Sequence, residues 1–95
     1  MMAIYIDALR YWPHTGKSWC HMASSLEGDA GLAELHSMAD KLGMKRAWFQ
    51  ARGNLPHYDL QPSKRALAIK HGAVEVDAVE LLHRCSTSPL YRKYP

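Results

Sequence analysis

The chain has 95 residues and a mass of 10.8 kDa, which is the size of a single domain. Hydrophobic residues make up 47% and charged residues 22%, so intrinsic disorder is not expected. The net charge of +3 is compatible with a nucleic acid, nucleotide or phosphate ligand but does not require one. No apolar run reaches the roughly 18–20 residues of a membrane span, and an aspartate at position 7 comes too early for a signal peptide. We therefore expect a cytoplasmic protein with no membrane partner.

The N-terminal part of the chain predicts two strands. Residues 2–9 alternate weakly between apolar and polar side chains and are rich in β-branched and aromatic residues, which is typical of a strand. Residues 12–18 are rich in proline, glycine and serine and predict a loop. Residues 19–23 predict a second, short strand.

The clearest helix begins near residue 30. Apolar side chains recur there at helical spacing, at Leu32, Leu35, Ala39 and Leu42. Asp29 is a candidate N-cap, and Gly43 stands where a C′ glycine ends a helix. Residues 44–50 predict the following strand, which gives a β–α–β succession.

The C-terminal part predicts two further helices around a short strand. After a short extended segment at residues 57–60, Pro62 stands where an N1 proline begins a helix, and Gly72 is placed to end it. Residues 73–76 predict the last strand, and Asp77 is a candidate N-cap for a helix that runs to residue 85.

These elements predict an α/β fold, a small single domain with a partly parallel sheet and two or three helices. We expect the domain to span residues 1–86 and residues 87–95 to form a flexible C-terminal tail. The two cysteines, Cys20 and Cys85, are not part of a CxxC pair, and we expect both to be reduced thiols.

The extended segment carries the first candidate site residues. His57 and Asp59 stand two residues apart, so both side chains leave the same face of a strand. A histidine and a carboxylate that project together can share a metal ion or act as an acid–base pair. His36 lies at the edge of the apolar stripe of the predicted helix. The candidate catalytic residues are therefore His57, Asp59 and His36.

Two further residues complete a candidate metal-ligand set. Asp7 ends the first strand, where open α/β sheets place ligand groups, and His21 lies in the second predicted strand. The candidate metal ligands are Asp7, His21, His36, His57 and Asp59, and the cofactor they predict is a divalent metal such as Zn, Mn or Mg. In the alternative interpretation, each histidine caps a turn or bonds a backbone carbonyl.

A basic pair follows the extended segment. Lys64 and Arg65 open a predicted helix just after Asp59, where backbone N–H groups and the helix dipole also attract anions. They are candidate phosphate-binding residues. A solvated helix face explains them equally well.

A series of short motifs resembles one protein family. The motifs are Tyr5-Ile6-Asp7, Trp19-Cys20-His21, Glu34-Leu35-His36 with Ala39 and Gly43, Trp48-Phe49-Gln50, His57-Tyr58-Asp59-Leu60, Lys64-Arg65-Ala66 and Gly72-Ala73-Val74. In this order they resemble the domain of unknown function 4031 family, small proteins of bacteria and their phages. The likeness covers residues 2–76 and implies a cytosolic bacterial or phage-borne protein. It places the five candidate metal ligands in the family pattern without giving them roles.

Three classes of function remain open at this point, and one of them is nucleotide or nucleic-acid binding as such. Another is a non-catalytic binding module that acts on a host or phage protein complex, for example to inhibit a host defence system. Aromatic and arginine side chains of the tail, Tyr91, Arg92 and Tyr94, suit such an interface. The alternative is a small metal-assisted hydrolase of a phosphoester or nucleotide. Convergence of His36, His57 and Asp59 in one cleft favours the enzyme, and their scattering favours the binding module.

Overall fold

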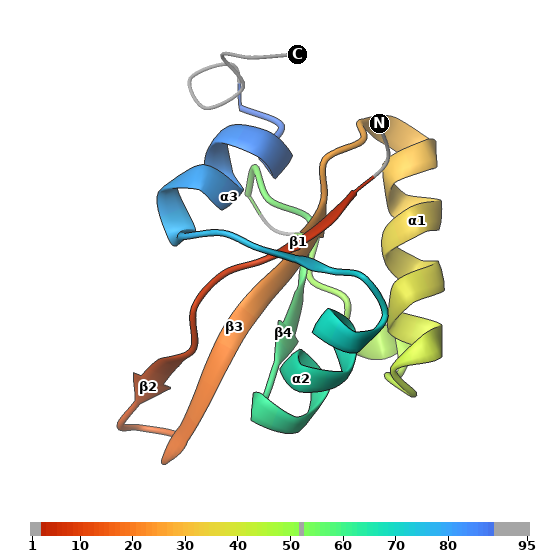
Figure 1. Ribbon diagram of the computed structural model, residues 1–95. Helices are drawn as coiled ribbons and strands as arrows, with labels where there is room; N and C mark the ends of the chain where they lie inside the picture. The colour runs from red at the N-terminus through yellow and green to blue at the C-terminus, as the bar shows by residue number, and fades with distance from the viewer. Residues whose placement is uncertain (1–2, 52, 89–95) are drawn as a thin grey trace.

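The chain forms a mixed sheet with helices on both of its faces (Figure 1). The computed structural model describes residues 3–51 and 53–88. The elements are β1 (Ile4–Ile6), β2 (Arg10–Trp12), β3 (Lys17–Ser24), α1 (Gly28–Lys41), the 3-10 helix η1 (Arg46–Trp48), β4 (Tyr58–Leu60), α2 (Pro62–Lys70), β5 (Val74–Glu75) and α3 (Ala78–Cys85). The predicted α/β class is confirmed, because the five-stranded sheet contains the parallel pair β1–β5 beside antiparallel pairs.

The long strand β3 is the centre of the sheet. Its residue Met22 pairs with Ile6 of β1 on one side and with Tyr58 of β4 on the other. Further along, β3 pairs with β2 in a hairpin that projects from the sheet at the lower left of Figure 1. The chain reverses direction at Gly16, whose φ of 68° is a left-handed conformation that glycine adopts at little cost.

The pairing of β3 is interrupted between β1 and β2. Ile6 pairs with Met22 and Arg10 pairs with Trp19, so residues 7–9 lie opposite residues 20–21. One strand therefore carries one residue more than its partner, as in a β-bulge, a feature that often lies beside functional sites. Asp7 is the first residue of this interruption.

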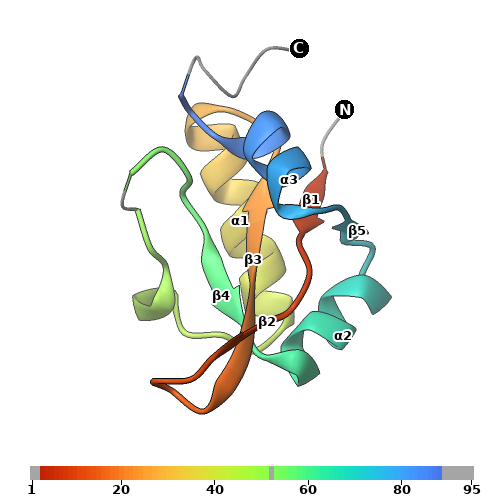
Figure 2. The ribbon, with the colours of Figure 1, turned by 90° about the vertical axis from the view of Figure 1, so that its left-hand side faces the viewer.

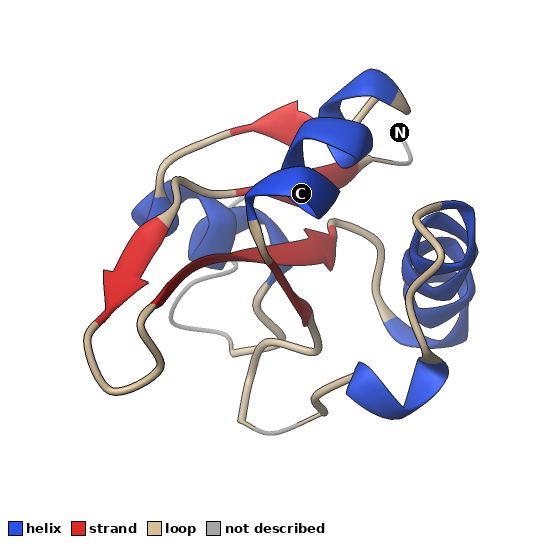
Figure 3. Cartoon of the chain, turned by 90° about the horizontal axis from the view of Figure 1, so that it is seen from below, coloured by secondary structure: helices blue, strands red, loops and turns tan. Residues whose placement is uncertain are grey.

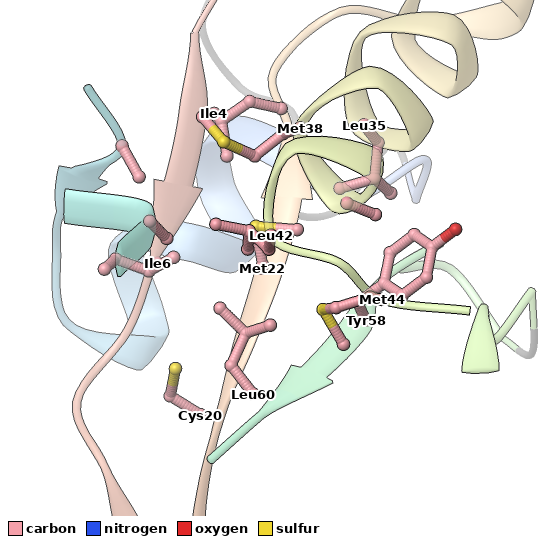
Figure 4. Packing of buried hydrophobic residues seen from close by; sticks show 13 residues of the cluster. Ile4, Ile6, Cys20, Met22, Leu35, Met38, Leu42, Met44, Tyr58 and Leu60 are labelled. Atoms are coloured by element: carbon pink, nitrogen blue, oxygen red, sulfur yellow. The ribbon is translucent and has the colours of Figure 1, made fainter. Parts of the chain in front are cut away.

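Helix α1 covers one face of the sheet and makes the main core. Figure 4 shows Leu35 and Met38 of this helix, with its C-cap Leu42, meeting strand side chains such as Met22 and Leu60. A smaller cluster on the other face joins Ala23 of β3 to Leu81 and Cys85 of α3. The view from below shows α1 to one side of the strands (Figure 3).

Two local predictions were wrong. Residues 44–50 do not form a strand: they contain η1, and only Gln50 makes a single bridge, to His57. The free edge of β3 is taken by β4, so no strand position is left there for residues 44–49. Helix α1 begins at Gly28 with Glu27 as N-cap, and Asp29 lies in the first turn, where its charge suits the helix dipole. By contrast, Pro62 at N1 and the Asp77 cap, which accepts a bond from the Glu80 N–H, are confirmed.

The C-terminal residues that the structure describes contact the domain. The Thr87 N–H donates to the Asn54 carbonyl at 2.6 Å, and Ser88 is buried. The first two residues of the predicted tail, 87 and 88, therefore contact the domain. The rest of the predicted tail, residues 89–95, lies outside the described residues. Within the described ranges, no helix combines the length and the apolar character needed to cross a membrane.

Truncation of Leu35 tests the core. Leu35 is 1% exposed and packs between α1 and the sheet, so Leu35→Ala is expected to lower the free energy of unfolding by about 2–5 kcal/mol. Chemical denaturation measures this loss. The matched control is Val79→Ala on α3, where the side chain is 63% exposed and the expected loss is below about 0.5 kcal/mol. A loss this small for Leu35→Ala would contradict the core assignment.

Candidate metal centre

Three side chains, from β3, from β4 and from the residue just before β4, meet on the sheet face opposite α1. His21 and Asp59 are register partners in the antiparallel pair β3–β4, so their side chains leave the same face side by side. His57 precedes Asp59 by two residues and projects from that same face. One potential ligand atom from each of His21, His57 and Asp59 lies within 4.8 Å of the other two. Figure 2 shows β4 running beside β3 at this point.

The spacing of His57 and Asp59 suits a shared cation. His57 Nε2 and Asp59 Oδ1 are 3.4 Å apart. Two ligands that are each about 2.0–2.1 Å from a tetrahedral ion also stand about 3.4 Å apart. Both atoms carry lone pairs when the imidazole is deprotonated at Nε2, so a proton or a metal ion between them relieves their repulsion.

The backbone selects the tautomer of His57. Its Nδ1 lies 2.6 Å from the Leu55 carbonyl oxygen, which can only accept a hydrogen bond. In the neutral imidazole the proton therefore resides on Nδ1, and Nε2 presents its lone pair toward Asp59. This is the arrangement of a metal-ligating histidine whose other nitrogen is held by a carbonyl.

Asp7 orients His21 in the same way. Its Oδ2 lies 2.8 Å from His21 Nδ1, and its Oδ1 accepts the backbone N–H of His21 at 2.6 Å. The carboxylate thus takes the place of a missing backbone acceptor at the strand interruption. It leaves Nε2 of His21 available to a metal. Hydrogen bonding to Asp7 raises the pKa of His21 above its usual value, against the opposing effect of burial.

Asp59 is held as a carboxylate. Its Oδ2 accepts a hydrogen bond from the Gln50 amide, and Oδ1 faces His57. In the absence of a metal, a proton on His57 Nε2 can form a hydrogen bond to this carboxylate, and that hydrogen bond, which outweighs burial, lowers the pKa of Asp59 below its usual range. The carboxylate is therefore ionised at neutral pH, as a metal ligand must be. A bound metal ion would take the place of that proton.

The cluster opens into a cavity of about 670 Å³, which we call the hairpin cavity. His21, His57 and Asp59 lie in its wall, and the β2–β3 hairpin supplies further lining residues, including Arg10, Trp12, His14, Thr15 and Trp19. A cavity of this size accommodates a small ligand or part of a larger one. No local sequence signal marks Gln50 or the hairpin residues as parts of the site, because their contribution depends on the pairing of β3 with β2 and β4.

The structure does not bring His36 to this cluster. His36 Nδ1 lies 2.7 Å from the Tyr58 hydroxyl, and its ring packs against Phe49 at 4.8 Å between centroids. Tyr58 stands between His57 and Asp59 in the chain, so its side chain leaves the opposite face, toward α1. The separation of His36 from His57 and Asp59 is the outcome that favours the binding module, whereas His21 takes the place of His36 beside the other two residues.

Lys64 and Arg65 support the fold near the site. Lys64 Nζ donates to the Leu42 carbonyl at the end of α1. Arg65 Nε donates to the Asp7 carbonyl at 3.0 Å, and its Nη2 pairs with Glu75 at 3.0 Å. Neither residue lines the hairpin cavity, but Lys64 lines a second cavity that also borders Asp59, and the predicted phosphate contact stays a prediction. Arg65 also helps to position Asp7.

The buried thiols are poor candidates for nucleophiles. Cys20 and Cys85 are both buried, and neither forms a disulfide. Burial, reinforced by the nearby Asp7 carboxylate, raises the pKa of Cys20 to about 12, so its thiol is protonated at neutral pH. The chemistry available here is that of two imidazoles and a carboxylate.

Comparison with known proteins places this α/β domain in a family. The family described as protein of unknown function (DUF4031) matches residues 4–88. The chain belongs to this family, as the resemblance of its motifs predicted. The match extends beyond residue 76, where that resemblance ended, and includes α3. Comparisons with curated proteins and with solved structures give no match.

Asp7→Asn tests the role of the buried carboxylate. The asparagine oxygen can still accept the His21 backbone N–H, but its amide nitrogen then faces Nδ1. Nδ1 must now accept, so the ring proton moves to Nε2 and blocks the metal position. Zinc affinity, measured by competition with a chromophoric chelator, is expected to fall about 10–100-fold.

The matched control is His71→Ala, because His71 is exposed at the end of α2, away from the cluster. It should bind zinc as the wild type does. Unchanged zinc affinity in a folded Asp7→Asn protein would contradict the assigned role of Asp7.

Proposed function

We propose that the protein is a small metal-dependent hydrolase of phosphoester bonds that works in the cytoplasm of a bacterium or a phage-infected host. The observation that carries the proposal is the convergence of His21, His57 and Asp59 in the wall of a cavity. The two imidazoles are presented in the tautomer that binds metal, by Asp7 and by the Leu55 carbonyl. A purely structural cluster does not require both of these arrangements.

Three protein ligands suit a catalytic ion better than a structural one. Structural zinc sites use four protein ligands, whereas catalytic sites use three and keep a position for water or substrate. A bound Zn²⁺ or Mn²⁺ would lower the pKa of a coordinated water toward about 7 and polarise the bond to be broken. The position of the cluster in the cavity wall gives a substrate access to that open position.

The surroundings favour an anionic substrate. Arg10 lines the hairpin cavity, and its guanidinium can approach a phosphoryl oxygen. In the hydrolysis, a water oxygen bonds to phosphorus, the P–O ester bond breaks, and the proton that the water loses ends on the leaving oxygen. From a phosphodiester, the products are a phosphomonoester and an alcohol.

The binding module stays a second proposal, and the separation of His36 from His57 and Asp59 is the observation in its favour. It drew on Tyr91, Arg92 and Tyr94, which lie outside the described residues. The metal cluster gives a protein-binding module no evident advantage. Failure of the metal experiments below would favour the binding module.

Metal removal and replacement test the hydrolase. The protein is stripped with a chelator, reloaded with Zn²⁺ or Mn²⁺, and assayed with bis(p-nitrophenyl) phosphate. We expect no activity in the stripped protein and recovery on reloading. His57→Ala and Asp59→Asn should each lose more than about 100-fold in activity, because even an outer-shell partner of a metal is worth about 10–100-fold.

His71→Ala and His36→Phe serve as controls in the same assay, since neither side chain belongs to the cluster. Both should keep the activity of the wild type in proportion to the folded fraction. Absence of metal uptake by the folded wild-type protein would refute the proposed function.

A further inference from the structure

A second cavity adjoins the metal cluster on its other side. It has a volume of about 580 Å³ and is formed by η1 and the start of α2, with Met44, Ala47, Trp48, Gln61, Ser63 and Lys64 among its lining residues. We call it the η1 cavity. Trp19, Gln50 and Asp59 line both cavities. The candidate ligand Asp59 therefore stands on the rim between two spaces, and a bond cleaved there has room for substrate on both sides.

All three tryptophans of the chain line these two cavities. Trp12 lies in the hairpin cavity and is 38% exposed, and Trp48 lies in the η1 cavity and is 49% exposed. Trp19 lies between them. Keeping large aromatic surfaces in contact with water is unfavourable, and exposed aromatic side chains in a groove are the usual platforms on which unpaired bases stack.

A cation accompanies each of the two exposed indoles. The Arg10 guanidinium is 5.2 Å from the Trp12 ring centroid, and Lys45 Nζ is 5.8 Å from that of Trp48. Residues 8–26 and 41–58, which contribute most of the lining, contain no aspartate or glutamate. Apart from Asp7 and Asp59, the acidic residues fall within residues 27–40 and 75–80. Apart from Asp7 and Asp59, the segments that supply most of the lining therefore carry basic side chains and no acidic ones.

We infer that the substrate is a single-stranded nucleic acid that passes the metal centre, with one base stacked on Trp12 and another on Trp48. This inference rests on the proposed function for the position of cleavage, but not for binding. Arg10 and Lys45 would face the phosphates beside the stacked bases. A mononucleotide fills only one cavity, and a duplex hides the faces of its bases. Hydrolysis between the cavities would give one fragment that ends in a phosphomonoester and one that ends in a hydroxyl.

Binding is tested without metal, so that it does not depend on catalysis. Fluorescence anisotropy follows 5′-labelled decathymidylate or decauridylate added to the protein in EDTA at low salt. We expect the wild type to bind at least one of the two decamers. Trp12→Ala and Trp48→Ala should each weaken this binding at least about fivefold, and Trp12→Phe, which keeps a stacking face, should weaken it less.

Tyr11→Ala is the matched control. Tyr11 lies on the same hairpin strand as Trp12 and is 60% exposed, but it is not among the residues that line either cavity. It should bind the decamer as the wild type does. Thermal unfolding of every variant confirms that the comparison is made between folded proteins.

Each of three results would overturn the inference. The tryptophan variants could bind the decamer as tightly as Tyr11→Ala does. Thymidine monophosphate or a blunt duplex could bind the wild type as tightly as the decamer does. The two proposals fail in distinguishable ways. If the wild type binds neither decamer but takes up metal and hydrolyses bis(p-nitrophenyl) phosphate, only the nucleic-acid substrate is rejected. Decamer binding by a protein that takes up no metal would reject the hydrolase and leave the binding surface.

Discussion

The buried carboxylate of Asp7 is the contact on which the arrangement of the site depends. A carboxylate that is 3% exposed is costly unless its oxygens are hydrogen-bonded, and here both are bonded to the same residue, His21. The strand interruption at residues 7–9 creates this need, because it removes a backbone acceptor from β3 at His21. Arg65 binds the Asp7 carbonyl and so connects α2 to the same point. The orientation of the His21 ring thus follows from the way β1 ends.

The alternation of β4 then divides the chemistry between two faces of the sheet. Tyr58 and Leu60 enter the core beneath α1, and His57 and Asp59 face the cavity. A shift of one residue in register would place two ionisable groups in the core, so burial of Tyr58 and Leu60 fixes the position of the candidate ligands. The same alternation explains the position of His36, whose partner is the Tyr58 hydroxyl at the edge of the core. Stability and site geometry therefore depend on one strand.

The sequence predicted those features that depend on short-range pattern. Helical spacing identified Leu35 and its neighbours as core, Pro62 and Asp77 marked two helix starts, and the two-residue spacing of His57 and Asp59 put them on one face. It did not predict which histidine joins them. His21 and Asp59 meet only because β3 pairs with β4 in one register, and a contact across 38 residues leaves no local signal. The strand expected at residues 44–50 was wrong for a related reason, since the edge of β3 that it would have used is occupied by β4.

The family to which the chain belongs supplies no activity. The proposed function therefore depends on whether a metal binds at His21, His57 and Asp59 through the atoms that their hydrogen bonds leave available. Nitrogen-15 NMR of the imidazole rings during a Zn²⁺ titration tests this directly. We expect the Nε2 signals of His21 and His57 to move to the range of metal-bound nitrogen while both Nδ1 atoms keep their protons, with His36 and His71 unchanged. Coordination through Nδ1, a response at His36 in place of His21, or no response at saturating Zn²⁺ would contradict the account.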